Sequence, residues 1–108
     1  GGYIGLEMGS VWLRLGSKVT VIEYADHICG AMDLQISKLL QRSLTKQGME
    51  FTLGARVTKV ETSGKGAVVR FEGSDKKAQK LEADVVLVAA GRRPFSEGLG
   101  LESVGVKK

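Results

Sequence analysis

The sequence predicts an α/β fold in which helices alternate with parallel strands. Its first nine residues are rich in glycine and lead into an apolar run with helical spacing, and a β-branched segment at residues 18–24 follows closely. Near the other end, residues 85–90 form an unbroken apolar run of strand length. A helix between a glycine turn and a valine-rich strand is typical of a βα unit, and an unbroken apolar strand is typical of a parallel sheet covered on both faces.

Two helices are predicted from apolar periodicity and from the residues at their ends. Gly16 is placed to end the first helix, Asp33 to cap the second, and Gly48 to end it. The stripes expected to face the core are Ile4, Met8, Val11, Trp12 and Leu15 in the first helix, and Ile36, Leu39, Leu40 and Leu44 in the second.

The remaining strands fall into two groups. Residues 51–53 are expected to form a short parallel strand after the second helix. Residues 56–62 and 67–72 flank Ser-Gly-Lys-Gly at 63–66 and predict an antiparallel hairpin, and residues 74–79 predict a second polar turn. The sequence therefore predicts a parallel sheet with an inserted antiparallel β-ribbon.

The glycine spacing at the start fits part of a dinucleotide-binding fingerprint. Gly2 and Gly5 correspond to its second and third glycines, and Glu23 follows Gly5 by 18 positions at the end of a strand. Gly2 would admit the pyrophosphate, and Glu23 would accept hydrogen bonds from the ribose and repel a 2′-phosphate, which favours NAD over NADP. The simpler interpretations are an ordinary tight turn and a solvated strand end.

The fingerprint's first glycine and the strand that carries it would precede Gly1, so we expect a Rossmann-like sheet whose first strand is missing from this chain. That strand is normally central, and its neighbours have unpaired backbone groups without it. Two explanations stay open: a longer natural protein supplies the strand, or another chain fills the gap.

Composition fits one ordinary globular domain, with 43% hydrophobic and 26% charged residues. The charge of +4 comes from scattered lysines and arginines without interleaved aromatic residues, which argues against nucleic-acid binding, and no run is long enough to span a membrane. Cys29 is the only cysteine, so it is expected to be a free thiol, and His27 to be a loop residue. No metal site and no catalytic residues are expected.

Five segments together resemble the NAD-binding domain of the dihydrolipoyl dehydrogenase family of flavoprotein disulfide reductases. They are Gly-Tyr-Ile-Gly-Leu-Glu-Met-Gly-Ser-Val-Trp at 2–12, Lys-Val-Thr-Val-Ile-Glu at 18–23, Met-Asp at 32–33, Lys-Gln-Gly at 46–48 and Ala-Asp-Val-Val-Leu-Val-Ala-Ala-Gly-Arg-Arg-Pro-Phe at 83–95. Ala90 replaces the threonine of many relatives. The resemblance implies that residues 1–108 are a partial NAD-binding domain.

The resemblance also implies a set of cofactor-binding residues. The turn would hold the pyrophosphate and approach the nicotinamide, Tyr3 would cover the flavin face until NADH displaces it, Val57 would line the adenine pocket, and Arg92 and Arg93 stay outside the site. Tyr3 could instead simply pack on a neighbour. The implied residues are Gly1, Gly2, Tyr3, Ile4, Gly5, Leu6, Glu7, Glu23, Val57 and Gly91.

For the parent enzyme, the resemblance implies oxidation of protein-bound dihydrolipoamide through a disulfide and FAD, with NAD as acceptor. FAD, the redox cysteines and a His-Glu base would lie outside this chain, which would be inactive alone. The resemblance also implies that the parent enzyme is a homodimer that interacts with lipoyl domains of 2-oxoacid dehydrogenase complexes. Its implied location is the bacterial cytoplasm or the mitochondrial matrix. The alternatives are another disulfide reductase or NADH oxidase, or a non-enzymatic nucleotide-binding module, and flanking Cys-x4-Cys and His-x4-Glu motifs would discriminate them.

Overall fold

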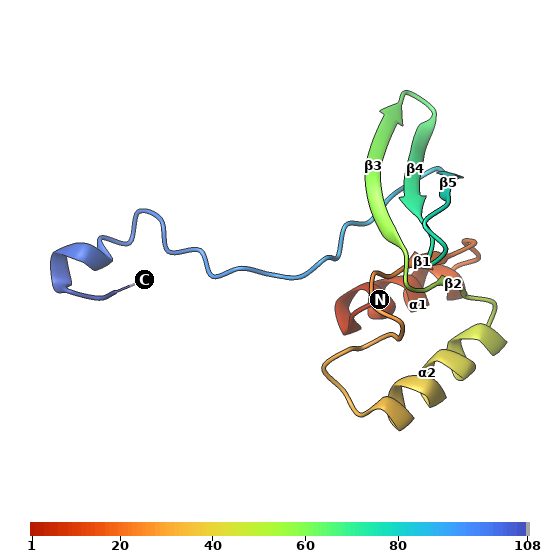
Figure 1. Ribbon diagram of the computed structural model, residues 1–108, viewed down its shortest axis with the longest axis horizontal. Coiled ribbons are helices and arrows are strands. Elements are labelled where there is room, and N and C mark those ends of the chain that lie inside the picture. The colour runs from red at the N-terminus through yellow and green to blue at the C-terminus, as the bar shows by residue number, and fades with distance from the viewer. Residues whose placement is uncertain (108) are drawn as a thin grey trace.

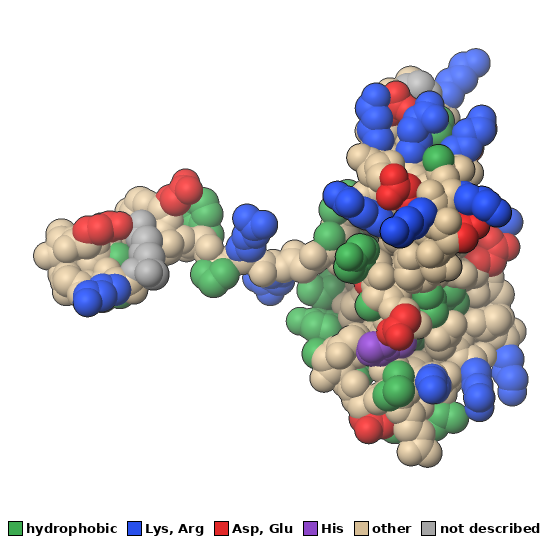
Figure 2. Space-filling view, viewed as in Figure 1, with side chains coloured by type: hydrophobic (Ala, Val, Ile, Leu, Met, Phe, Trp, Pro, Cys, Tyr) green, Lys and Arg blue, Asp and Glu red, His purple; other side chains and the backbone are tan. Residues whose placement is uncertain are grey.

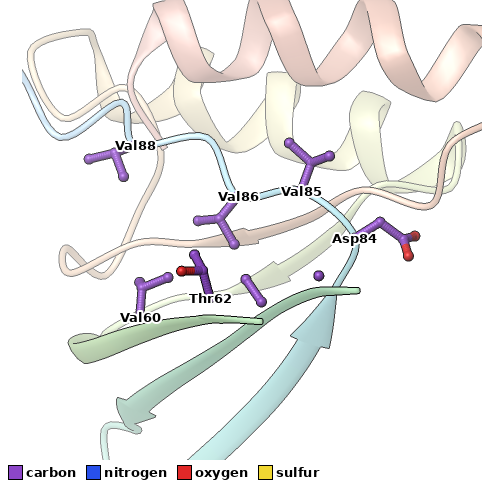
Figure 3. A pocket seen from close by; sticks show the side chains of 8 residues that line it. Val60, Thr62, Asp84, Val85, Val86 and Val88 are labelled. Atoms are coloured by element: carbon purple, nitrogen blue, oxygen red, sulfur yellow. The ribbon is translucent and has the colours of Figure 1, made fainter. Parts of the chain in front are cut away.

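The computed structural model describes residues 1–107, and for Ser63 only the backbone (Figure 1). From residue 84 the chain has no regular secondary structure; it first passes between the ribbon and the helices and then extends away from the rest of the structure to a short 3-10 helix, η1 (Figure 1 and Figure 3). The elements in chain order are α1 (Tyr3–Arg14), β1 (Thr20–Ile22), α2 (Leu34–Lys46), β2 (Glu50–Thr52), β3 (Arg56–Ser63), β4 (Gly66–Glu72), β5 (Ala78–Ala83) and η1 (Leu101–Val104).

The strands form one parallel pair and one antiparallel ribbon. β1 pairs with β2 in parallel, and the ribbon has the order β3-β4-β5. Val21 packs into a core on the helical side, and its neighbour Ile22 packs into a second core with Phe71 of the ribbon. Because successive strand side chains point to opposite faces, β1 separates the helices from the ribbon. The predicted mixed α/β architecture is therefore confirmed.

The ends of α2 are where local chemistry predicts them. The carboxylate of Asp33 accepts hydrogen bonds from the N–H groups of Gln35 at 2.9 Å and Ile36 at 3.2 Å. At the other end Gly48 adopts a left-handed conformation with φ of +103°, which glycine tolerates without strain. Both the cap and the stop are confirmed.

The predicted apolar stripe of α2 is only half right. Leu44 is buried and Leu40 packs against the same core, but Ile36 and Leu39 are more than half exposed. The buried face includes Ser37 instead, whose hydroxyl donates to the carbonyl of Cys29 at 3.5 Å. A polar side chain with a nearby acceptor can occupy a core position that a hydrophobicity pattern assigns to its neighbours.

The predicted core stripe of α1 is wrong for most of its members. The helix packs through Leu6 and Gly9, with Leu13 beside them. Since α1 is apolar on two opposite sides, periodicity alone could not identify the packed one. Gly9 identifies it, because only a small residue allows close approach to the neighbouring core. The exposed members of the predicted stripe are Ile4, Met8, Val11 and Leu15.

Two strand predictions also need correction. Residues 85–90 form no strand, because no strand among residues 1–107 pairs with them in a hydrogen-bonded ladder. Residues 78–83 form β5, which was not predicted, and the polar turn expected at 74–79 ends before its last two residues. β5 lies on an edge of the ribbon and is largely exposed, so it lacks the apolar alternation that marks a strand in a sequence.

The ribbon carries an exposed ion-pair network that tests its register. Glu61 on β3 contacts Arg70 on β4, with 2.7 Å between Oε2 and Nε, and Lys59 on its own strand at 2.9 Å. The Arg70 hydrogen bond, assisted by Lys59, lowers the pKa of Glu61 from 4.5 to about 2. The network's contribution to stability is therefore complete above pH 4.5 and is lost as the pH falls toward 2.

We expect Arg70→Gln to raise the pKa of Glu61, because it removes the cation that stabilises the carboxylate most. Carbon-detected NMR titration of the side-chain carboxyl measures this. Lys80→Gln is the matched control, since Lys80 pairs with Glu82. An unchanged Glu61 pKa in Arg70→Gln would contradict the observed register.

Candidate functional site

The N-terminus of α1 has no side-chain cap. Gly2 is the N-cap residue, with extended backbone angles, and its carbonyl accepts the first helical hydrogen bond from Leu6 at 3.1 Å. The N–H groups of Tyr3, Ile4 and Gly5 meet no acceptor among residues 1–107. Free N–H groups and the partial positive charge of a helix start together favour an anion. This end of α1 can therefore receive one.

Glu23 lies directly after β1 and next to the glycine turn. Its N–H donates to the Thr52 carbonyl at 2.9 Å, which continues the parallel ladder. Its carboxylate accepts from the N–H of Ala25 at 2.8 Å, and its other oxygen is 2.9 Å from the Gly1 nitrogen. The side chain is 23% exposed.

The pKa of Glu23 is lowered from its ordinary value. Burial raises this pKa, and the hydrogen bond from the Ala25 N–H is the largest of the contacts that lower it. Because the folded pKa is the lower one, Glu23 stabilises the fold at neutral pH, and this contribution is lost as the pH falls through the lowered pKa. The site therefore holds a carboxylate in its ionised form.

Backbone hydrogen bonds bring the start of the ribbon and the loop after β1 close to Glu23 and Gly1. The N–H of Ala55, just before β3, donates to the Glu23 carbonyl at 2.9 Å, and the N–H of Cys29 donates to the Gly1 carbonyl at 2.9 Å. Val57 follows two residues after Ala55 and is 44% exposed. The start of the ribbon thus lies beside the carboxyl end of β1.

The extended segment passes close to α1. A Cβ atom on Gly5 would lie 3.3 Å from the Ala89 side chain, so Gly5 allows this approach. Gly91 follows two residues later with φ of +113°, and nothing lies within 4 Å of the position its Cβ would take. Of the predicted residues, Gly1, Gly5 and Glu23 therefore lie together at the start of α1, and Gly91 lies on the extended segment two residues after Ala89.

The other predicted residues of the turn divide into packed and exposed ones. Leu6 is 4% exposed and belongs to the core, so its side chain holds the helix in place. Tyr3 is 59% exposed, and Ile4 and Glu7 are exposed as well. Sequence reasoning missed Ala25, whose N–H orients the Glu23 carboxylate, because a backbone donor leaves no trace in residue type.

Cys29, His27, Arg92 and Arg93 were not expected to belong to the site, and the structure shows their surroundings. Cys29 is a buried free thiol. His27 lies 2.5 Å from the Asp26 carboxylate, and this contact lowers the pKa of Asp26. Among residues 1–107 no group of three or more potential metal ligands comes together, and no helix in that range is long and apolar enough to cross a membrane. Arg92 and Arg93 are exposed.

A groove of about 480 Å³ lies elsewhere, between the ribbon and the extended segment (Figure 3). Val86 points toward the ribbon, and Val85 points the opposite way, toward the helices (Figure 3). The lining is mostly aliphatic, and Asp84 is its only charged residue. An anionic phosphate finds no cation there, so the groove is not the candidate site.

A glycine turn at a helix start, followed by an acidic strand end, is an arrangement typical of nucleotide-binding α/β domains. The family profile described as pyridine nucleotide-disulphide oxidoreductase matches residues 1–108, and the chain belongs to this family.

Comparison with individual proteins shows which members of the family the chain is similar to. The chain is 54% identical to dihydrolipoyl dehydrogenase 3 of Pseudomonas putida, over 98% of this chain and 23% of that protein. It is 56% identical to mitochondrial dihydrolipoyl dehydrogenase of Pisum sativum, over 98% and 21% respectively. Leghemoglobin reductase of Vigna unguiculata is also 56% identical, over 98% of this chain and 20% of that protein. The chain therefore spans about a fifth of the length of these relatives.

Solved structures agree on the fold. LpdA from Mycobacterium tuberculosis matches with a TM-score of 0.79 and 29% identity, over 98% of this chain and 22% of that one. The HOCl-induced flavoprotein disulfide reductase RclA from Escherichia coli matches with a TM-score of 0.79 and 30% identity, over 98% and 23%. The expected family and fold are confirmed.

Gly9→Val should destabilise the fold by about 1–3 kcal/mol, because overpacking displaces core side chains. A Cβ at Gly9 already lies 3.3 Å from both Met49 and Val19. Gly64→Val is the control, since nothing lies within 4 Å of its Cβ position. Urea unfolding followed by circular dichroism compares the two. Equal stability would show that α1 does not pack through Gly9.

Proposed function

We propose that residues 1–108 form the NAD(H)-binding part of a flavin-dependent dihydrolipoyl dehydrogenase. One observation carries the proposal: the uncapped start of α1 lies next to an ionised carboxylate, Glu23, at the carboxyl end of β1. A dinucleotide needs both features, because its pyrophosphate is an anion and its adenosine ribose offers two hydroxyl donors. The similarity to dihydrolipoyl dehydrogenases over nearly the whole chain supports the choice of enzyme.

In this proposal the chain binds and orients the cofactor. Free N–H groups of α1 hold the pyrophosphate, and Gly2 admits it because the space beside its Cα is empty within 4 Å. The Glu23 oxygens each accept one bond from the protein, so lone pairs stay free for ribose hydroxyls. Val57 lines the adenine side, and Gly91 leaves space beside the cofactor.

The nicotinamide side involves Tyr3 and Glu7. Tyr3 is exposed on the first turn of α1, so it has room to cover a neighbouring ring and to move away from it. The exposed Glu7 lies one turn further along the helix. In this proposal Tyr3 covers the flavin until NADH displaces it, and Glu7 lies near the nicotinamide.

The redox chemistry belongs to parts of the protein outside this chain. FAD supplies hydride transfer to NAD, and a cysteine pair exchanges electrons with dihydrolipoamide. Cys29 is the only cysteine of the chain and is buried, so residues 1–108 alone have no dehydrogenase activity in this proposal.

We also propose the setting of the complete enzyme. It is a homodimer that accepts electrons from lipoyl domains of 2-oxoacid dehydrogenase complexes, in the bacterial cytoplasm or the mitochondrial matrix. Relatives from Pseudomonas putida and from Pisum sativum mitochondria represent both settings. Another disulfide reductase or an NADH oxidase is the alternative, since RclA shares the fold. A Cys-x4-Cys motif upstream and a His-x4-Glu motif downstream favour the lipoamide enzyme.

The cofactor preference tests the role of Glu23. In the full-length enzyme we expect Glu23→Ser combined with Tyr24→Arg to shift the ratio of kcat/KM for NADH over NADPH by at least roughly tenfold toward NADPH, because repulsion of the 2′-phosphate is replaced by attraction. Glu50→Ser, which removes a carboxylate from β2, should leave the ratio unchanged. Equal efficiency with both cofactors in the unaltered enzyme would refute the role of Glu23.

A second prediction concerns the open edge of β1. Among residues 1–107 β1 pairs only with β2. Gly1 lies next to the end of β1, because its nitrogen contacts the Glu23 carboxylate. A chain extended upstream by about ten residues, enough for one strand, should bind NAD⁺ more tightly and unfold more cooperatively, because that strand would support the glycine turn. Calorimetric titration and thermal unfolding of both chains measure this. Equal affinity and equally sharp unfolding would show that the strand is dispensable.

A further inference from the structure

β3 does not keep one register with β4 along its whole length. From Lys59 onward the two strands pair regularly, beginning with Lys59 opposite Arg70. The next pair in the other direction is Val57 with Phe71, so β3 has one residue more than β4 between these two pairs. The extra residue is Thr58. One extra residue in one strand of an antiparallel pair is a β-bulge, and bulges re-aim the side chains beside them.

The bulge decides which face of the ribbon carries Val57. Side chains alternate along a regular strand, so Val57 and Val60, three positions apart, would lie on opposite faces. Residues that pair directly share a face, and Val60 pairs with Val69. Val57 pairs with Phe71, which is two positions from Val69 and therefore lies on the same face. Because of the bulge, Val57 and Val60 thus share one face.

The opposite face of the ribbon is charged. Lys59 pairs with Arg70 there, and both contact Glu61. Figure 2 shows basic and acidic side chains close together over the ribbon, at the upper right. A regular strand would place Val57 on this charged face, whereas the bulge places it on the face of the apolar Phe71.

The face that carries Val57 is the one that packs against β1. Phe71 is buried in the second core together with Ile22, and Ile22 directly precedes Glu23. The N–H of Ala55 donates to the Glu23 carbonyl at 2.9 Å, so the chain just before β3 is held at the same place. Phe71 is only 5% exposed, but Val57 is 44% exposed. Val57 therefore offers an apolar surface to a ligand beside Glu23.

The side chain of Thr58 supports the bulge. Its hydroxyl donates to the carbonyl of Arg70, the residue opposite the bulge, at 3.2 Å. A hydroxyl can serve the backbone in this way where an extra residue disrupts the ladder. Thr58 is exposed, so it acts through this hydrogen bond and not through burial in the core.

We propose that Thr58 is a positioning residue for the adenosine half of the cofactor and that it acts through Val57. Its hydroxyl holds the bulge, and the bulge holds Val57 on the face that meets the carboxyl end of β1. An aliphatic side chain fixed there gains affinity by burying apolar area against the adenine base. The inference rests on the proposed function, which puts adenine beside Val57.

An explanation without a ligand is that the bulge protects an edge. β3 lies at one edge of the ribbon, and bulges on edge strands hinder pairing with another chain. Protection of the edge does not depend on where Val57 points. It therefore predicts normal cofactor binding when the hydroxyl of Thr58 is removed.

The test compares Thr58→Val, which keeps the branched shape but removes the hydroxyl, with Thr58→Ser, which keeps the hydroxyl. In the full-length enzyme we expect Thr58→Val to raise the KM for NAD⁺ about three- to fivefold at unchanged kcat, because the lost contact is the same in the ground state and the transition state. The inhibition constant of ADP-ribose, which contains adenosine but no nicotinamide, should rise by the same factor. Thr58→Ser should restore both constants to within about twofold. A partly unfolded enzyme would instead lose kcat at unchanged KM.

Thr62→Val makes the same chemical change on the same strand and is the matched control, which should alter neither constant. A double-mutant cycle then shows whether Thr58 acts through Val57. Val57→Ala should raise both constants by itself, and adding Thr58→Val to it should raise them no further.

Three results would overturn the inference, and they differ in what happens to the proposed function. If Val57→Ala raises both constants and Thr58→Val does not, the proposed function stands and the bulge serves the edge of the ribbon. If the two effects multiply, Thr58 acts independently of Val57. If neither variant changes either constant, the adenine side of the proposed function fails together with the inference.

Discussion

The arrangement of the candidate site depends on how the glycine turn is fixed to the end of β1. The Glu23 carboxylate lies against the Gly1 nitrogen, and the Gly1 carbonyl accepts from Cys29 in the loop that follows β1. These bonds, together with the buried Leu6, place the start of α1 beside the strand end. The Ala25 N–H favours the ionised form of this carboxylate, and the contacts of Gly1 determine where the free N–H groups of α1 point. Structure and proposed chemistry rest on one set of polar contacts.

β1 is only three residues long, yet it organises both sides of the molecule. Val21 belongs to the helical core and Ile22 to the ribbon core, so a shift of register by one residue would exchange the two sets. Gly9 brings α1 within contact of Val19 and Met49, which fixes the helix on one side of the strand. The ribbon reaches Glu23 from the other side through the N–H of Ala55. The glycine turn is therefore positioned by contacts from both the helical side and the ribbon side of β1.

Features that depend on local chemistry could be predicted from the sequence. Asp33 caps α2, Gly48 ends it, and Glu23 ends β1 next to the glycine turn, because each depends on a residue type and its immediate neighbours. Features that depend on a distant partner could not. The apolar run at 85–90 has the composition of a buried strand but needs a neighbouring strand to become one. The Ala25 N–H that orients Glu23 has no sequence signal, since every residue but proline offers the same group.

Under the proposed function, the two helix starts show how ligand binding can oppose local stability. Asp33 supplies two hydrogen bonds to the start of α2, whereas α1 begins at Gly2 with no side-chain cap. A capping side chain stabilises a helix by about 1 kcal/mol, so α1 forgoes that stabilisation. A capping carboxylate at Gly2 would occupy the N–H groups that a phosphate needs and would repel the phosphate's charge. In the proposed function, the missing cap therefore leaves these N–H groups free for the cofactor's phosphates.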